Sequence, residues 1–215
     1  MAIELIEIRD KNRELIGVID DFISVIWHAV YFGVGDFEIY AKATRRNLEL
    51  LQEEFYVTRS DDIEVGIIEG VQISNNAQDG KTIVANGRFV KSILDRRWIL
   101  NINGKQNNPT ILRGNVETAV RGVVANNAIT AAIAARNISF LQLGALSNLP
   151  AIIVDENGNA AQKQVSHENL LEYTDAALQE YGYASTVLLE EATKNLQYVV
   201  YAGINRSIDN NAGLQ

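Results

Sequence analysis

Four carboxylates gather in one short stretch of the sequence, where their chemistry could serve cation binding or acid and base catalysis. They are Asp61, Asp62, Glu64 and Glu69. Calcium is held by clustered carboxylate oxygens, and glycoside hydrolases use a pair of carboxyl groups. The spacing matches no calcium loop, and Asp61 with Asp62 also suits a turn, in which such side chains bond the backbone. We expect the structural role; the alternative is a cell-wall carbohydrate-degrading enzyme that uses Asp61, Asp62 or Glu64.

Other groups that catalysis or metal binding would need are separated in the sequence or absent from it. The chain has two histidines, His28 and His167, in unrelated segments, and it has no cysteine. Structural zinc sites are built mainly from cysteine and histidine, and a serine hydrolase needs a histidine base beside its nucleophile. Gly33-x-Gly35 lacks the third glycine of a dinucleotide-binding loop. We therefore predict no catalytic residue, no metal and no cofactor.

The two tryptophans could serve a different activity, because an indole ring offers a large apolar face. Trp27 and Trp98 would be the stacking platforms of a carbohydrate-binding module. Both lie in apolar patterns, so we expect them to be buried, and the module is the less favoured hypothesis.

One cluster of charges directly follows a strand pattern. It consists of Arg88, Lys91, Asp95, Arg96 and Arg97. Such a cluster can meet an acidic surface on a partner, including another copy of the same chain. It can equally pair with carboxylates of its own domain. We take these five residues as candidate intersubunit or barrel-mouth contacts, and the sequence favours neither.

The composition excludes several classes of function. The chain of 215 residues has a formal net charge of −8, whereas contact with nucleic-acid phosphates needs a concentrated basic face. Hydrophobic residues at 47% and charged residues at 21% are typical of a folded globular chain. No apolar run reaches the roughly 18 residues of a membrane helix, and the N-terminus lacks the pattern of a signal peptide. We predict no membrane span and no specific nucleic-acid partner.

Alternation of apolar and polar residues predicts paired strands through most of the first hundred residues. Thr44 can cap a short helix that runs to Phe55, and Gly66 and Gly70 permit close backbone approach or strong coiling. We therefore predict a β-rich α+β fold in which residues 1–100 form a small antiparallel β-barrel closed by a short helix. The predicted hairpins comprise residues 3–8 with 15–19, 23–31 with 37–41, and 65–73 with 83–89.

The second half of the chain reads as a separate unit. The turn-rich residues 101–114 predict a linker. Asn115 can cap a helix through Asn127, and Ser166 can open a helix that ends at Tyr181 before Gly182. A hairpin over residues 187–202 completes a second barrel-like or α+β unit at 115–206, and the polar residues 207–215 predict a frayed tail.

Several segments occur in a characteristic order along the chain. They are Ile16-Gly17-Val18-Ile19-Asp20-Asp21-Phe22, Ile26-Trp27, Tyr31-Phe32-Gly33-Val34-Gly35-Asp36-Phe37-Glu38, Gly66-Ile67-Ile68-Glu69, Gly87-Arg88-Phe89, Leu94-Asp95-Arg96-Arg97, residues 116–121 with Asn126-Asn127, the helix at 169–181 with Gly182-Tyr183, and the strand at 196–203. Together they resemble siphophage tail proteins of the baseplate-hub, Tal-like class.

This resemblance implies a structural virion component of a phage or prophage. Hub proteins of this class contain barrel domains and form a trimeric ring at the end of the tail tube. They contact the distal tail protein and receptor-binding or fibre proteins. The resemblance thus implies a non-catalytic homo-oligomer at the tail tip, made in the cytoplasm of the bacterial host.

Overall fold

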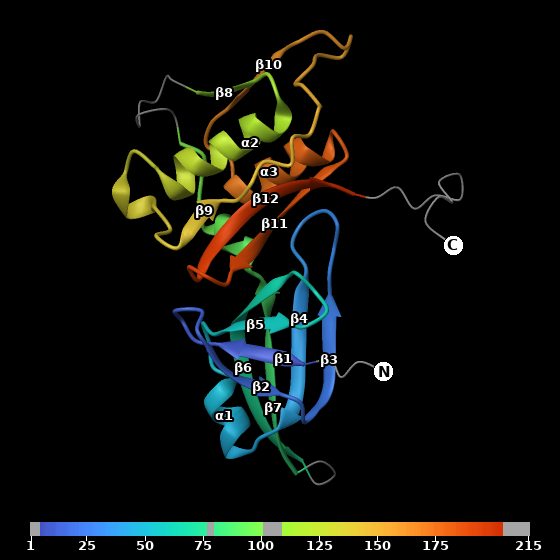
Figure 1. Ribbon diagram of the computed structural model, residues 1–215, viewed down its shortest axis with the longest axis vertical. Coiled ribbons are helices and arrows are strands. Elements are labelled where there is room, and N and C mark those ends of the chain that lie inside the picture. The colour runs from blue at the N-terminus through green and yellow to red at the C-terminus, as the bar shows by residue number, and fades with distance from the viewer. Residues whose placement is uncertain (1–4, 77–79, 101–108, 204–215) are drawn as a thin grey trace, which may run out of the picture.

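The computed structural model describes residues 5–76, 80–100 and 109–203, which form two units stacked along the long axis of the molecule (Figure 1). Strands β1 to β7 make the first unit, and the remaining strands with the two longer helices make the second. Three residues between the predicted strands 65–73 and 83–89 (77–79), most of the predicted linker (101–108) and the predicted tail (207–215) lie outside the described residues.

The first unit is one seven-stranded antiparallel sheet with the order β2-β1-β5-β6-β7-β4-β3. The predicted hairpins are present as β1 with β2, β3 with β4, and β6 with β7. Its strands are β1 (Ile6–Arg9), β2 (Leu15–Ile19), β3 (Phe22–His28), β4 (Asp36–Lys42), β5 (Tyr56–Arg59), β6 (Val65–Asn76) and β7 (Gly80–Phe89).

The sheet is open, so the predicted closed barrel is corrected. Strands β2 and β3 form its two edges, and among the described residues no pairing joins them. Only Asp20 and Asp21 separate them in sequence, which holds the Cα atoms of Ile19 and Phe22 within about 11 Å. The edges therefore approach at one corner of a curved sheet. On the β2 edge strand, the Arg46 side chain donates to the carbonyl of Val18 at 2.8 Å.

The concave face of this sheet holds the core of the first unit. Ile6, Ile8, Ile39 and Ala85 are fully buried there. Gly66 allows the close approach that the sequence predicted, because a Cβ at this position would lie 2.4 Å from the Phe37 ring. The apolar residues of the alternating pattern therefore form a buried core, although the sheet does not close into a barrel around it.

Helix α1 (Arg45–Leu50) packs against this core, with Leu50 and Leu51 buried. Thr44 caps it as predicted, accepting a bond from the Asn47 amide at 3.2 Å. The helix stops before the predicted end at Phe55. Glu54 has a φ of 68° and its amide bonds the carbonyl of Ile68, while the carbonyl of Phe55 accepts the Ile68 amide. Pairing with β6 thus replaces the last predicted helical turn.

The second unit contains two helices and two small sheets in a mixed α+β arrangement, whereas the sequence left a barrel-like and an α+β unit open as alternatives. β8 pairs with β10, while the other sheet has the order β11-β12-β9, with β9 parallel to β12. Part of the predicted linker therefore forms a strand. The elements are β8 (Thr110–Arg113), α2 (Val116–Val124), the π-helical turn η3 (Ala125–Ile129), the 3₁₀ turn η4 (Ala134–Arg136), β9 (Leu141–Leu143), β10 (Gln162–Val165), α3 (Leu170–Gln179), β11 (Tyr183–Glu190) and β12 (Asn195–Ala202).

The two units are joined through a shared apolar core. The 3₁₀ helix η1 (Val90–Arg96) leaves the end of β7 and contributes Val90, Ile93 and Leu94 to the core of the second unit. Three residues of the first sheet belong to the same core. Along the chain, the change from the core of the first unit to the core of the second therefore falls between Phe89 and Val90, before the predicted linker (101–114). The residues from the sheet are Tyr56, Val65 and Ile67.

None of the helices in the described ranges is both long and apolar enough to cross a membrane.

Candidate functional site

The predicted charge cluster lies at the joint between the two units. Arg88, at the end of β7, donates to both carboxylate oxygens of Glu69 at 3.0 and 2.9 Å and to Asp95 at 3.2 Å. These bonds, the one to Glu69 above all, raise the pKa of Arg88. A bulge in β6 between Ile68 and Gly70 places Glu69 where it faces this arginine. Arg88 and Asp95 are thus fixed by partners within their own chain.

Lys91 is the most deeply buried member of the cluster. Lys91 is 3% exposed, and its Nζ donates to both carboxylate oxygens of Asp175 on α3, at 2.9 and 3.1 Å. Ser185 on β11 donates to the same carboxylate at 3.3 Å. A buried ion pair is stable only when both charges are satisfied, so this contact ties η1 to the second unit.

Asp95 and Arg97 also bind the second unit. The side-chain amide of Asn169 donates to the carbonyl and the carboxylate of Asp95, at 2.9 and 3.0 Å. The Arg97 guanidinium donates to the carbonyl of Arg136 at 2.9 Å. These contacts connect the end of η1 to α3 and to η4.

Asn169, not Ser166, is the N-cap of α3, which corrects the predicted start of that helix. Its Oδ1 accepts the amides of Leu171 and Glu172 at 2.9 and 3.2 Å. His167 between the two candidate caps has a φ of 60°, a left-handed conformation outside a helix. The bonds from Asn169 to Asp95 select this cap, because they fix its side chain at the joint.

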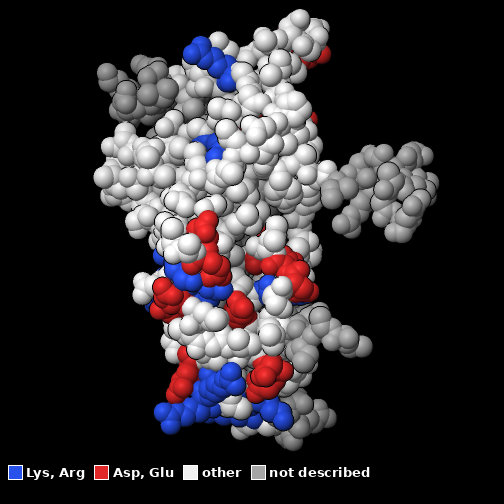
Figure 2. All heavy atoms as spheres, viewed as in Figure 1, with Lys and Arg blue, Asp and Glu red and all other residues white. Residues whose placement is uncertain are grey.

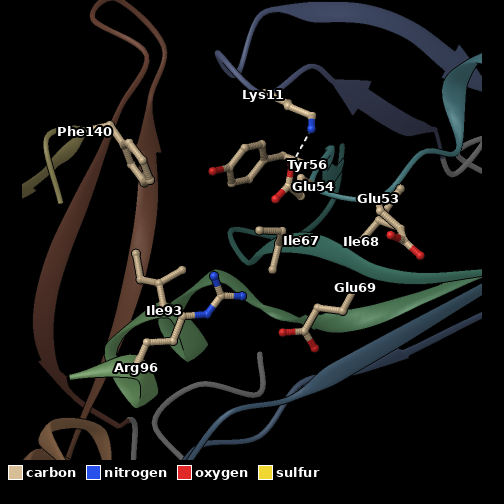
Figure 3. A pocket seen from close by; sticks show the side chains of 10 residues that line it. All are labelled: Lys11, Glu53, Glu54, Tyr56, Ile67, Ile68, Glu69, Ile93, Arg96 and Phe140. Carbon is tan, nitrogen blue, oxygen red and sulfur yellow. Dashed lines mark hydrogen bonds and ion pairs between the residues drawn. The ribbon is translucent and has the colours of Figure 1, made fainter. Parts of the chain in front are cut away.

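Arg96 differs from its neighbours because its side chain is exposed and reaches a pocket of about 460 Å³ beside the joint. Figure 3 shows its guanidinium beside Ile67, with the Phe140 ring opposite Tyr56 and Lys11 paired with Glu54 at the rim. The pKa of Glu54 is lowered, chiefly by the hydrogen bond from Lys11 and to a smaller degree by Arg96. The pocket thus has an apolar floor and a charged rim. Its lining consists of Lys11, Glu53, Glu54, Tyr56, Ile67, Ile68, Glu69, Ile93, Arg96 and Phe140.

Each carboxylate of the acidic cluster has its own structural partner. Asp61 accepts two bonds from Arg59, at 2.8 and 2.6 Å. Asp62 accepts the Trp27 indole N–H at 3.2 Å and the Glu64 amide at 2.9 Å. Glu64 accepts the hydroxyl of Thr186 on β11 at 2.8 Å. This arrangement matches the turn-forming role expected of Asp62.

Neither histidine lies in a group that could hold a metal. His28 faces Asp36, with 3.4 Å between Nδ1 and Oδ2, and Nδ1 of His167 lies 2.9 Å from the Ser166 hydroxyl. In the described part of the chain, no cluster of three or more histidine, aspartate or glutamate side chains is arranged for a metal ion.

The tryptophans have different environments. Trp27 packs against Phe37 and Phe89, with ring centroids 5.6 and 4.9 Å away, and Arg59 lies over its ring. Trp27 is partly buried and Trp98 is 55% exposed, so the expectation that both would be buried is wrong for Trp98 and met only in part by Trp27. Trp98 is exposed because η1 ends at Arg96 and the chain lies outside the core between Leu94 and Ile99.

Burial of Glu64 gives one prediction about pH. Burial raises the pKa of Glu64 above its ordinary value of 4.5, while the bond from Thr186 opposes the shift. The folded state therefore holds this proton more tightly, and the carboxyl's contribution to stability decreases as pH rises from about 4.5 through the folded pKa. We expect Glu64→Gln, which keeps an acceptor for Thr186, to be at least as stable as the wild type at neutral pH.

The measurement is urea unfolding of both proteins across this pH range. The stability advantage of Glu64→Gln should shrink as the pH falls toward 4.5. An advantage that stays constant with pH would show that folding does not raise the pKa of Glu64.

The fold is that of phage tail proteins. Prophage tail protein gp18 from Listeria monocytogenes EGD-e aligns with a TM-score of 0.51 and 13% identity over 91% of this chain and 50% of that chain. The tail protein from Neisseria meningitidis MC58 aligns with a TM-score of 0.55 and 13% identity over 96% and 52%. The chain thus spans about half the length of each. No curated protein sequence matches it.

The sequence profile of the Siphovirus ReqiPepy6 Gp37-like protein family matches residues 5–213, so the chain belongs to that family. The family and the shared fold confirm the resemblance to siphophage tail proteins found in its sequence.

The sequence did not reveal two buried charges in the second unit. Glu117 and Arg121 lie on α2 and are 1% and 6% exposed. In the sequence, Glu117 has only the pattern of an acidic residue in the first turn of a helix, where the helix dipole favours it. Their one-turn spacing inside an otherwise apolar helix is the signal that could have indicated a buried pair of polar anchors.

Proposed function

We propose that this chain is a structural subunit of a phage or prophage tail tip that assembles with further copies of itself into a ring at the end of the tail tube. The observation that carries the proposal is the family match over residues 5–213. A ring subunit in this position would contact the distal tail protein and the tail tube, and would link them to receptor-binding or fibre proteins.

The two edges of the first sheet support self-assembly. Edge strands usually carry charges or prolines that prevent pairing with other chains. Neither β2 nor β3 contains an aspartate, glutamate, lysine or arginine. Both edge strands also expose large apolar side chains, which favour burial against another protein. These side chains are Leu15 and Ile16 on β2 and Ile23 and Ile26 on β3.

Within the charge cluster, Arg96 is the residue whose placement best suits an intersubunit contact. Arg88, Lys91, Asp95 and Arg97 each bond within the chain, whereas the Arg96 side chain is exposed at a pocket. An acidic chain would offer carboxylates to this arginine from a neighbouring copy. We therefore assign the intersubunit role to Arg96 and a role in joining the two units to the other four residues.

Assembly tests the proposal. We expect the wild-type chain to sediment as an oligomer at tens of micromolar, and Arg96→Glu to weaken self-association about tenfold, since a close charge pair at an interface contributes roughly 1.4 kcal/mol or more. Its unfolding midpoint should stay within experimental error of the wild type, because the side chain is exposed.

Arg97→Glu is the matched control, since it changes the same charge one residue along. It loses the bond to the Arg136 carbonyl, so we expect it to lower the unfolding midpoint more than Arg96→Glu does. A wild-type chain that stays strictly monomeric would count against self-assembly, and equal association of wild type and Arg96→Glu would remove Arg96 from the interface.

A further inference from the structure

An irregular segment of the second unit, which we call the strap (residues 144–152), is held in place by buried charged side chains. Glu117 on α2 accepts the amides of Ser147 and Leu149 at 2.7 and 3.0 Å. Arg121, one turn further on, donates to the carbonyls of Gly144 and Ala145. Residues 144–151 form no helix or strand, and only Ile152 makes an isolated β-bridge, with Asn115, so these two side chains bond main-chain groups that a strand partner would otherwise bond.

Further bonds fix both ends of the strap. The Asn115 side chain donates to the carbonyl of Leu149, and the Ala151 amide donates to the Tyr183 hydroxyl at 3.2 Å. The Gly144 amide bonds the carbonyl of Tyr198 at 3.0 Å. Burying a carboxylate and a guanidinium is costly unless each is well bonded, and here both serve the main chain of one segment. The strap is therefore held in a single defined conformation.

The outer face of the strap is apolar and carries no charge. Leu146 and Ile152 are 52% and 49% exposed, and Leu143 is exposed immediately before the strap. No charged residue lies between Arg136 and Asp155, although 21% of the chain is charged. The strap crosses the front of the second unit (Figure 1), and Figure 2 shows that this face is almost free of charged side chains, whereas the first unit is rich in them.

Two properties select the occupant of this face. The strap has no lysine or arginine, so it has no affinity for the phosphates of an anionic membrane or of nucleic acid. Copies of a chain with net charge −8 repel one another, and that repulsion is weakest where uncharged surfaces meet. The chain has a second apolar surface on its other unit, at the open edge strand β3, which contains no aspartate, glutamate, lysine or arginine of its own, although Glu38 of β4 lies opposite Ile26.

We propose that the strap of one copy docks on the open β3 edge of the next copy in the assembly. Two different surfaces of one chain make a heterologous, head-to-tail contact, and such contacts form a ring when the rotation between successive copies closes. This inference rests on the proposed function, and it names the surfaces that the copies use. Exposed Leu146 and Ile152 on one side would meet Ile23 and Ile26 on the other.

The first test measures self-association of Leu146→Glu by sedimentation. We expect it to weaken self-association at least tenfold, because it places a charge in the centre of an apolar contact. Asn157→Glu, which adds the same charge at an exposed position outside the strap, should associate as the wild type does. Equal association of Leu146→Glu and wild type would overturn the strap while leaving the proposed function standing. A strictly monomeric wild type would overturn both.

The second test needs no charged substitution, and it still decides the matter if Leu146→Glu fails to fold. The chain has no cysteine, so a Leu146→Cys copy and an Ile26→Cys copy with tags of different mass can be mixed and joined by a short bismaleimide. We expect heterodimeric product in clear excess over a Glu156→Cys control, and competition by unlabelled wild-type chain should reduce it. A yield no higher than that of the control would overturn the docking.

Discussion

Replacing Lys91 with alanine is expected to lower the free energy of unfolding by about 3–5 kcal/mol, because removal of one partner leaves a buried charge unpaired. The side chains of Lys91 and Asp175 are 4% and 17% exposed. After the substitution, Asp175 retains only the Ser185 hydroxyl among the bonds described above. Urea unfolding followed by circular dichroism measures the change.

Lys163→Ala is the matched control for this substitution. Lys163 also pairs with a carboxylate, that of Glu180 at the C-cap of α3, but the Lys163 and Glu180 side chains are 35% and 51% exposed. An exposed pair contributes about 0–1 kcal/mol, so this variant should unfold almost as the wild type does. Equal losses for Lys91→Ala and Lys163→Ala would show that the pair between the units contributes no more than a surface pair.

The role of Lys91 illustrates what the sequence could not provide. Its partner Asp175 lies 84 residues further along the chain, and only the folded joint brings them together. From the sequence, Lys91 belongs to a charge cluster that equally suits a surface. Whether a charge is buried depends on which distant segment covers it, and periodicity within a short window contains no such information.

The hairpins could be predicted because their pairing is local. Alternating residues on either side of a short turn gave β1 with β2, β3 with β4, and β11 with β12. Pairing of β1 with β5 and of β4 with β7 joins segments that are distant in sequence. That pairing sets the strand order and leaves β2 and β3 as open edges. A barrel was therefore a reasonable expectation from the strands, but closure depends on contacts that the strands do not encode.

The short strands β8 and β10 could not be predicted from the sequence for a different reason. The segment Thr110–Arg113 alternates between buried and exposed residues, but it lies among glycine, asparagine and proline, which predict a turn. Its partner β10 (Gln162–Val165) has one buried residue, Val165. The two strands stabilise each other, and β8 also contacts α2, so neither has a strong signal of its own.

The second large effect is expected from Glu117→Ala, which removes the acceptor for the amides of Ser147 and Leu149. Each unsatisfied amide costs about 1–3 kcal/mol, so we expect a loss of about 2–5 kcal/mol in the free energy of unfolding. Amide hydrogen exchange at Ser147 and Leu149 should accelerate, because the strap loses its fixed conformation. Self-association should weaken with it if the strap docks on a neighbouring copy.

Glu172→Ala is the matched control, because Glu172 is the acidic residue in the first turn of α3 as Glu117 is in that of α2. Glu172 is exposed, so its loss removes mainly the interaction with the helix dipole, about 0.3–1 kcal/mol. Glu117→Gln keeps one acceptor oxygen and should lie between the two. If Glu117→Ala left exchange at Ser147 and Leu149 unchanged, the strap would be held by its apolar contacts, and the buried carboxylate would need another explanation.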